Sequence, residues 1–381
     1  MKEPPEAGPG RPPLVTCQNC GSDVPAGEYC GHCGAHLPTG RAHRRDAFAA
    51  APVEHVAHLS IVSTLFPHLP HRDGRPFQVA LAGGVAIVLI FLAFHLFALA
   101  TVAAVFALPV LYLMYLYEVE VYESEPWLVI GATMVMGALL GLAFTNATAG
   151  ALAQLDLTGD RDTGLVVAGV AVPIAGQALM LAGPLFLYLF RSRFREPLDG
   201  VTFGAASALG FTLTSSLTAL WPLISGDSLV AGGPPLDWAV RLARDGLLVA
   251  IVNASTTALI TASLWLHRFD LRLRDRPWHS TLLASLVIGF GAQVALGIEG
   301  FVVSELVTDV VIVALAAAAL LLYLRFVIHE ALLVEGAEHE IGPDSPCPEC
   351  HRMVPTMAFC PACGAARAAA PKQVRTGVGI V

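Results

Sequence analysis

The stretch from Val79 to Tyr117, VALAGGVAIVLIFLAFHLFALATVAAVFALPVLYLMYLY, is almost uninterrupted apolar sequence. About 39 residues, each adding 1.5 Å to a helix, are too many for one crossing of a ~30 Å hydrocarbon core and fit two crossings. Similar runs recur along the chain, so the sequence predicts an all-α polytopic membrane bundle of about eight transmembrane helices. These spans are expected near residues 79–97, 99–117, 127–149, 165–190, 201–224, 246–266, 281–298 and 302–327.

The composition indicates that most of the chain is embedded in the lipid bilayer, which is its main partner. Of the 381 residues, 55% are hydrophobic and 14% are charged, against roughly 25% charged in a soluble domain. The net charge of -8 argues against a nucleic-acid partner. Lysine is nearly absent while Arg, Ala, Gly, Val and Leu are abundant, which is typical of a GC-rich bacterial genome.

Arginine placement predicts the orientation of the chain in the membrane, because cytoplasmic loops carry an excess of positive charge. Eight spans put both termini on one side. If that side is the cytoplasm, the inside segments hold ten arginines and the outside loops hold three. The inside arginines are Arg72, Arg75, Arg191, Arg193, Arg195, Arg268, Arg272, Arg274, Arg276 and Arg325, and the outside ones are Arg161, Arg241 and Arg244. The expected location is therefore the bacterial cytoplasmic membrane, with both termini cytoplasmic.

Eight cysteines fall in two windows of identical spacing, CQNCGSDVPAGEYCGHCG near the start of the chain and CPECHRMVPTMAFCPACG near its end. The predicted metal ligands are Cys17, Cys20, Cys30 and Cys33 in the first window, and Cys347, Cys350, Cys360 and Cys363 in the second. Four thiolates in a tetrahedral array suit Zn²⁺ and leave no open position for a substrate. The pattern predicts two structural zinc ribbons. Disulfides and a rubredoxin-like iron site are the alternatives, and a reducing cytosol disfavours the first.

The residues around the cysteines refine this prediction. Glycine after the second cysteine of a CxxC turn accommodates the turn. Tyr29 and Phe359 each precede a third cysteine, and we expect them to pack over the metal sites. The first ribbon has no Lys or Arg between its outer cysteines, which again disfavours nucleic acid. Docking of a cytosolic or membrane protein partner, or mutual pairing of the ribbons, is the expected use.

The predicted domain organisation places the membrane region between the two ribbons. Its parts are a disordered leader (1–15), the N-terminal ribbon (16–37), a linker (38–76), the transmembrane domain (77–328), a second linker (329–345), the C-terminal ribbon (346–366) and a disordered tail (367–381). In the first linker, about Val53 to Phe66 is predicted to be an amphipathic helix on the membrane surface. A linker helix with solvated histidines is the alternative.

Charged residues within the spans are few, and each is a candidate functional group because charge at mid-membrane is costly. Glu305 and Asp309 lie four residues apart near the outer end of the last span, and His95 ends the first. We interpret these as interfacial or structural residues. A cluster of Glu118, Glu120, Glu123 and Glu125 is interpreted as a solvated or arginine-paired loop. Neither a zinc peptidase site nor a proton relay is visible in this pattern.

Four stretches of the membrane region resemble the PrsW family of intramembrane peptidases, over about residues 77–328. Residues 120–127, EVYESEPW, look like the family's DRYEPEPW, and residues 172–180, VPIAGQALM, align with its PxxEExxK. Residues 197–205, PLDGVTFGA, look like LDGIVYGA, and GFTLTSS at 210–216 follows against GFxxxEN. Residues 253–258, NASTTA, align with HAxxTA. The resemblance implies a helical bundle related to proteins that cut peptides within the membrane.

The resemblance also implies that the catalytic positions are degenerate. Gly176 and Gln177 stand where the family has paired glutamates, and Met180 stands at its lysine. Ser215, Ser216 and Asn253 stand at its Glu, Asn and His. Peptide hydrolysis needs a base for the water and an electrophile or acid for the carbonyl, and these side chains supply neither.

The sequence therefore predicts a pseudoprotease: a non-catalytic scaffold or regulator whose cytosolic ribbons bind a protein partner. The alternatives are an active intramembrane peptidase with substitute residues, or a transporter. Any interior pocket is expected to be lined by polar residues of the fourth to sixth spans. These are Gln177, Ser207, Thr212, Thr214, Ser215, Ser216, Asn253, Ser255 and Thr256.

Overall fold

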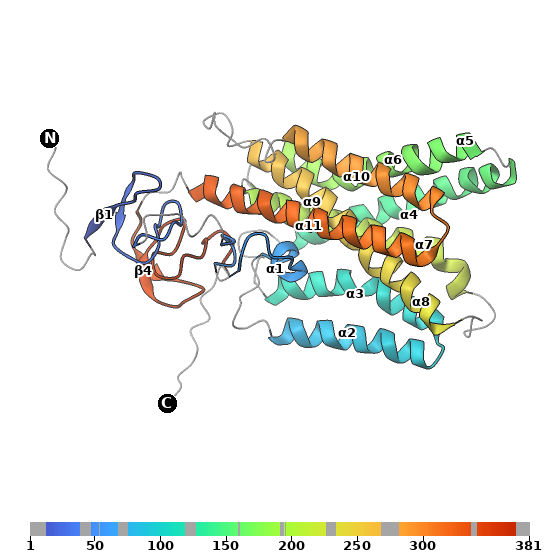
Figure 1. Ribbon diagram of the computed structural model, residues 1–381, viewed down its shortest axis with the longest axis horizontal. Coiled ribbons are helices and arrows are strands. Elements are labelled where there is room, and N and C mark those ends of the chain that lie inside the picture. Colours follow the sequence, from blue (N-terminus) through green and yellow to red (C-terminus); the bar gives the residue numbers. More distant parts are fainter. Residues whose placement is uncertain are drawn as a thin grey trace.

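The predicted fold class is confirmed: the chain is a bundle of long helices with two small β modules together at one end (Figure 1). The computed structural model describes residues 13–38, 47–52, 54–67, 75–118, 127–158, 161–190, 194, 196–225, 234–267, 282–336 and 341–370. Among these residues, seven helices are long and apolar enough to cross a membrane, and Phe77–Ala93 is a shorter apolar helix. The expected count of about eight is met if this helix also crosses.

The helices are α1 (Ile61–Leu65), α2 (Arg75–Ala93), α3 (Phe97–Glu118), α4 (Trp127–Thr158), α5 (Arg161–Gly164), α6 (Val172–Phe190), α7 (Pro197–Ile224), α8 (Pro235–Leu242), α9 (Val249–His267), α10 (Leu282–Val302) and α11 (Leu306–Gly336). Two π-helical stretches, η3 (Leu165–Ala171) and η4 (Ala243–Leu248), join α5 to α6 and α8 to α9 into continuous rods. Successive rods run in opposite directions. The start of α2 and the end of α11 therefore both lie at the end of the bundle that carries the ribbons (Figure 1).

Several sequence predictions concern residues outside this described part. They include most of the leader and tail, the acidic segment 120–125, and most of the arginines that predict orientation. Within the described part, α11 continues to Gly336, so the first residues of the predicted linker 329–345 are helical. His95 lies in the turn between α2 and α3 with a positive φ of 57°, which divides the long apolar run into two helices.

Glycines let the central helices touch backbone to backbone. A Cβ on Gly137 of α4 would lie 2.1 Å from the Ser207 carbonyl oxygen, and one on Gly210 of α7 would lie 2.0 Å from the Met134 carbonyl oxygen. Nearer its N-terminus α7 meets α9, where Thr261 donates a 2.6 Å hydrogen bond to the Gly200 carbonyl. Small residues and hydroxyls commonly bring membrane helices this close. Helix α7 therefore forms the centre of the bundle, between α4 and α9.

Each ribbon is a two-stranded antiparallel hairpin followed by a second turn. Strand β1 (Leu14–Thr16) pairs with β2 (Asp23–Pro25), and β3 (Asp344–Pro346) pairs with β4 (Met353–Pro355). The predicted glycine turn after a CxxC motif is present at Gly21, Gly34 and Gly364, with φ of 74°, 71° and 76°. The fourth such turn departs from the prediction, because His351 adopts the same left-handed conformation with φ of 58°.

A strap, defined as residues 47–52 and 54–66, connects the ribbons to the bundle. The predicted surface helix over about Val53 to Phe66 is wrong for most of this length, since only α1 is helical. The physical reason is Arg325 of α11, which is 0% exposed and needs partners. The strap supplies them from its side chains and from a backbone carbonyl, and that arrangement replaces a regular helix with turns before α1.

Candidate functional site

The first candidate site is a pair of four-cysteine clusters, one in each ribbon. In each cluster the four sulfur atoms all lie within 4.8 Å of one another. The Sγ atoms of Cys17 and Cys33 are 3.8 Å apart, and those of Cys347 and Cys363 are 3.9 Å apart. Four sulfurs held tetrahedrally at about 2.3 Å from one ion are spaced about 3.8 Å from each other. The clusters therefore have the dimensions of a tetrathiolate metal site.

The same distances are too long for a disulfide, whose sulfurs lie about 2.05 Å apart, and all eight cysteines are free. Hydrogen bonding among the sulfurs already favours a thiolate in each cluster. The Cys30 thiol lowers the pKa of Cys33 to about 4, and the same contact raises the pKa of Cys30. In the second cluster the Cys347 thiol lowers the pKa of Cys360. The spacing of the sulfur atoms in each cluster therefore fits a thiophilic cation.

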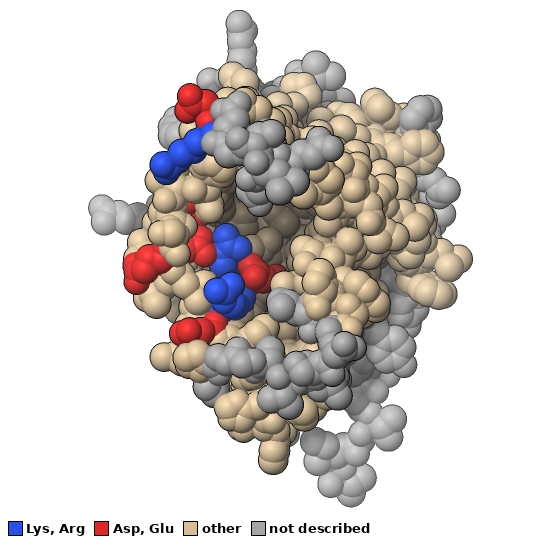
Figure 2. All heavy atoms as spheres, turned by 90° about the vertical axis from the view of Figure 1, so that its right-hand side faces the viewer, with Lys and Arg blue, Asp and Glu red and all other residues tan. Residues whose placement is uncertain are grey.

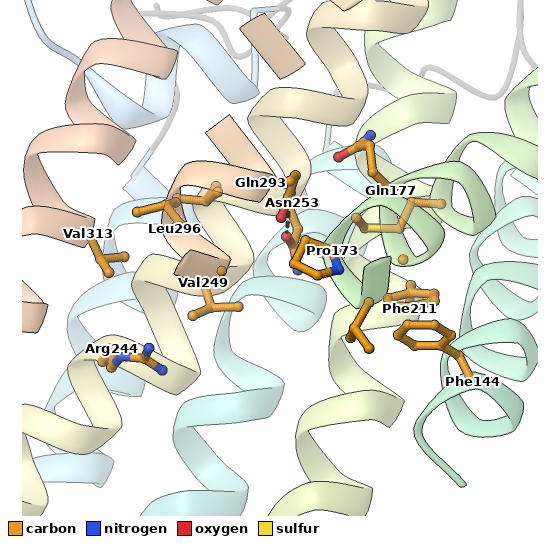
Figure 3. A pocket seen from close by; sticks show the side chains of 15 residues that line it. Phe144, Pro173, Gln177, Phe211, Arg244, Val249, Asn253, Gln293, Leu296 and Val313 are labelled. Carbon is orange, nitrogen blue, oxygen red and sulfur yellow. Dashed lines mark hydrogen bonds between the residues drawn. The ribbon is translucent and has the colours of Figure 1, made fainter. Parts of the chain in front are cut away.

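The second candidate site is a pocket of about 240 Å³ inside the bundle (Figure 3). Its lining comes mainly from α6, α9 and α10, with single residues from α4, α7, η4 and α11. The lining residues are Phe144, Val172, Pro173, Gly176, Gln177, Met180, Phe211, Arg244, Val249, Val252, Asn253, Gln293, Leu296, Gly297 and Val313. Figure 2 shows the end of the bundle away from the ribbons: its surface is hollowed, and charged side chains gather at one side of the hollow.

Three carboxamides and two hydroxyls form a hydrogen-bonded network along the pocket. Gln293 donates to the Asn253 Oδ1 at 2.9 Å and to the Thr256 hydroxyl at 3.1 Å. Asn253 donates to the Thr212 hydroxyl at 2.9 Å. The Thr256 hydroxyl donates to Gln177 Oε1 at 2.9 Å, which ties α6 to α9. The network joins four helices, and every one of its members is neutral.

Arg244 is the charged residue in the lining, and it is ion-paired. It contacts Asp309 through Nε and through Nη2, the latter at 3.2 Å, and it contacts Asp245 at 2.7 Å. The carboxylate of Glu299 is buried beside this group. Asp309 on α11 therefore has a structural role, because its ion pair with Arg244 joins α11 to η4 beside the pocket. Arg244, predicted to lie in an outside loop, instead belongs to the rod of η4 and α9.

The predicted site residues divide into two groups. Gly176, Gln177, Met180 and Asn253 all line the pocket, as the alignment of motifs implied. Ser207, Thr214 and Ser215 do not line it and bond backbone carbonyls within the helix packing. Ser216 and Ser255 are also absent from the lining, as are Thr212 and Thr256, whose hydroxyls nevertheless belong to the network. Sequence reasoning missed Gln293, whose signal was only that of a single amide within an apolar span.

The described lining of the pocket contains no His, Cys, Asp or Glu. Among the described residues, the groups of such side chains that could hold a metal ion are the two cysteine clusters. Carboxamides and hydroxyls on their own are poor ligands for zinc, which binds nitrogen, sulfur and carboxylate oxygen. The pocket residues therefore do not fit a catalytic metal, whereas the ribbon residues do fit a structural one.

These features define a multi-pass membrane protein that carries, at one end, two four-cysteine clusters able to hold metal ions and, inside the bundle, a pocket whose lining includes neutral amides and one ion-paired arginine. Residues 125–290 match the family described as PrsW family intramembrane metalloprotease. The match covers α4 to α9 and part of α10, so it includes Gln177 and Asn253 and ends shortly before Gln293. It confirms the resemblance predicted from the sequence motifs. No curated protein and no solved structure matches the chain.

Proposed function

We propose that this chain is a non-catalytic relative of intramembrane metalloproteases, a scaffold or regulator that binds a protein partner. One observation carries the proposal: the three amides in the pocket lining bond to each other or to hydroxyls packed behind them. None of them ionises near neutral pH, so none takes a proton from water as a general base. Gln177, which stands at a degenerate glutamate position, is 0% exposed, and its Oε1 accepts a hydrogen bond from the Thr256 hydroxyl.

The ion pairs of Arg244 support the same conclusion. An arginine could stabilise a developing negative charge in a reaction, but only if its charge is available. Here two carboxylates already contact the guanidinium, one of them through two nitrogen atoms. The arginine thus holds η4 against α11. In this proposal the pocket binds a polar group of a membrane ligand without cleaving it.

The ribbons in this proposal are structural Zn²⁺ sites in the cytoplasm of a bacterium. The sulfur spacing supports zinc, since four thiolates at these distances suit its tetrahedral preference. Both ribbons stand at one end of the bundle, and the arginine distribution supports placing that end in the cytoplasm. The matched family is the observation that favours the second candidate function, an active peptidase with substitute residues.

The two candidates differ in what they do to other membrane proteins. We would express the chain in bacterial membranes and compare new peptide N-termini by mass spectrometry with those from a Gln177→Ala, Asn253→Ala double variant. Asn146→Ala is the matched control, since Asn146 is an exposed amide on α4. The proposal expects identical peptide sets from all three chains. A peptide made by the parent and the control, and missing from the double variant, would establish the peptidase instead.

A further inference from the structure

The two ribbons have the same cysteine spacing, so each residue of one has an equivalent in the other. Tyr29 and Phe359 each precede a third cysteine, and Gly31 and Pro361 each follow one. These equivalent positions meet in space. The Tyr29 N–H donates a hydrogen bond to the Pro361 carbonyl at 2.9 Å, and the Phe359 N–H donates one to the Gly31 carbonyl at 2.9 Å.

This pairing is reciprocal. Each ribbon gives the N–H before its third cysteine and accepts at the carbonyl after it, as in a contact related by a two-fold axis. Both pairing positions adjoin Cys30 or Cys360, which are 0% exposed. A metal bound by those cysteines would hold the backbone on both sides of them in place. The pairing surface is therefore part of the metal site's own framework.

The side chains at the contact break the symmetry. Met357 is 3% exposed and packs into the cluster of Cys17, Val24, Cys30 and Ala35. A Cβ on Gly31 would lie 2.2 Å from the Met357 sulfur, so a larger residue at that position would displace the Met357 side chain. The position equivalent to Met357 is Gly27, where a Cβ would lie 2.7 Å from the Pro361 carbonyl oxygen.

The sizes of these side chains favour pairing of the N-terminal ribbon with the C-terminal ribbon over pairing of two identical ribbons. If two C-terminal ribbons paired in the same way, Met357 of one would face Pro361 of the other. Pro361 is larger than Gly31, the residue that faces Met357 in the actual pair. Two N-terminal ribbons would oppose Gly27 with Gly31 and leave the space of a methionine side chain empty, and voids of that size destabilise a contact. Only the pairing of one with the other fills the interface without overlap.

We infer that the surface around the third cysteine of each ribbon is a ribbon-recognition surface, built so that the N-terminal ribbon binds the C-terminal ribbon. Each ribbon's first partner is the other ribbon of the chain, and any protein partner meets the joined pair. This inference does not depend on whether the membrane pocket is catalytic.

The joined pair also reaches the membrane domain. The Ala366 N–H of the C-terminal ribbon donates to the Ala49 carbonyl of the strap at 3.1 Å. The Ala49 N–H donates in turn to Nδ1 of His329 on α11, also at 3.1 Å. The N-terminal ribbon thus binds the C-terminal ribbon. The C-terminal ribbon is hydrogen-bonded to the strap, and the strap is hydrogen-bonded to α11.

The test uses the full chain with a protease site inserted between residues 337 and 340. After purification in detergent with zinc, the chain is cut there, and the fraction of the C-terminal fragment that stays with the rest is measured after washing. We expect the parent chain to retain the fragment. Met357→Glu and Gly31→Leu should each lower retention at least tenfold. Met353→Ala is the matched control, a methionine of the same ribbon that is 66% exposed, and it should retain the fragment.

Zinc per chain is measured on each uncut variant to report whether its ribbons remain folded. If Gly31→Leu loses metal, retention is judged from Met357→Glu, because that variant changes the other ribbon. If both lose metal, the exchanged pair Gly31→Met with Met357→Gly decides it, because it restores the large-to-small match and should restore retention. Equal retention in the parent and in both metal-loaded variants would overturn the inference. Release of the fragment from the parent chain would overturn it as well.

Discussion

Arg325 is a fully buried cation on α11, and replacing it with methionine tests how the strap is held. Its Nη1 donates to the Ser63 hydroxyl at 2.6 Å, and its Nη2 contacts Glu54 at 2.7 Å and the His55 carbonyl at 3.2 Å. The guanidinium also lies 4.0 Å from the centre of the Phe48 ring. Methionine keeps a similar stem and removes the charge and every donor.

The expected cost follows from these contacts. Breaking a buried ion pair by removing one partner costs about 3–5 kcal/mol. Glu54 is 27% exposed on its side chain and regains some water when it loses the arginine, so the lower end applies. A loss of about 3 kcal/mol corresponds to roughly a 100-fold rise in the population of the detached strap.

Hydrogen exchange measured by mass spectrometry reports that population directly. The amides of Phe48, Ala51 and Glu54 are bonded within the strap, at 2.8 to 3.0 Å. They should exchange roughly 100-fold faster in Arg325→Met, in line with the free-energy loss. The matched control is Arg352→Met, an exposed arginine of the C-terminal ribbon, which should leave them unchanged. Unchanged protection in Arg325→Met would refute the idea that this cation fastens the strap.

Three further predictions concern the packing, a ribbon turn and the pocket. Gly210→Leu should lower the free energy of unfolding by about 1–3 kcal/mol, because its Cβ would overlap the Met134 carbonyl. Thermal unfolding in detergent measures this, with Gly150→Leu, at a glycine with open space around it, as the neutral control. His351→Gly should stabilise the C-terminal ribbon by about 1 kcal/mol, because glycine adopts a positive φ without strain. It should slow metal loss to a chelator, and faster loss would contradict the assigned turn. Asn253→Leu removes bonds to Thr212 and Gln293 and should cost about 1 kcal/mol of stability. A melting temperature equal to the parent's would show that the network does not hold α9.

Much of the fold could be predicted from the sequence because the bilayer imposes a simple rule. Runs of apolar residues longer than one crossing had to become pairs of helices, and their boundaries follow from length. The cysteine clusters were equally readable, since CxxC spacing fixes which sulfurs can meet. The pocket's Gln177 and Asn253 were found through aligned family motifs, and the family match over residues 125–290, shorter than the predicted 77–328, includes both positions.

Other features depend on contacts between distant parts of the chain and left no local signal. Gln293 lies in α10 among apolar residues, and its partners are on α9. Arg325 looked like a charge at a helix end, and only the folded strap explains its burial. The ribbon pair joins windows separated by the whole membrane domain. Glycines 27 and 31 gave no sign in the sequence that they oppose Pro361 and Met357.

The most decisive measurement is the zinc content of the detergent-purified chain, with and without all eight cysteines changed to serine. We expect two zinc atoms per chain in the parent, one for each four-cysteine cluster, and none in the cysteine-free variant. Such a result would leave the membrane pocket without a metal, as expected of a described lining that has no His, Cys, Asp or Glu. A zinc atom retained after the eight substitutions would contradict the proposed non-catalytic function and make the metallopeptidase the better description.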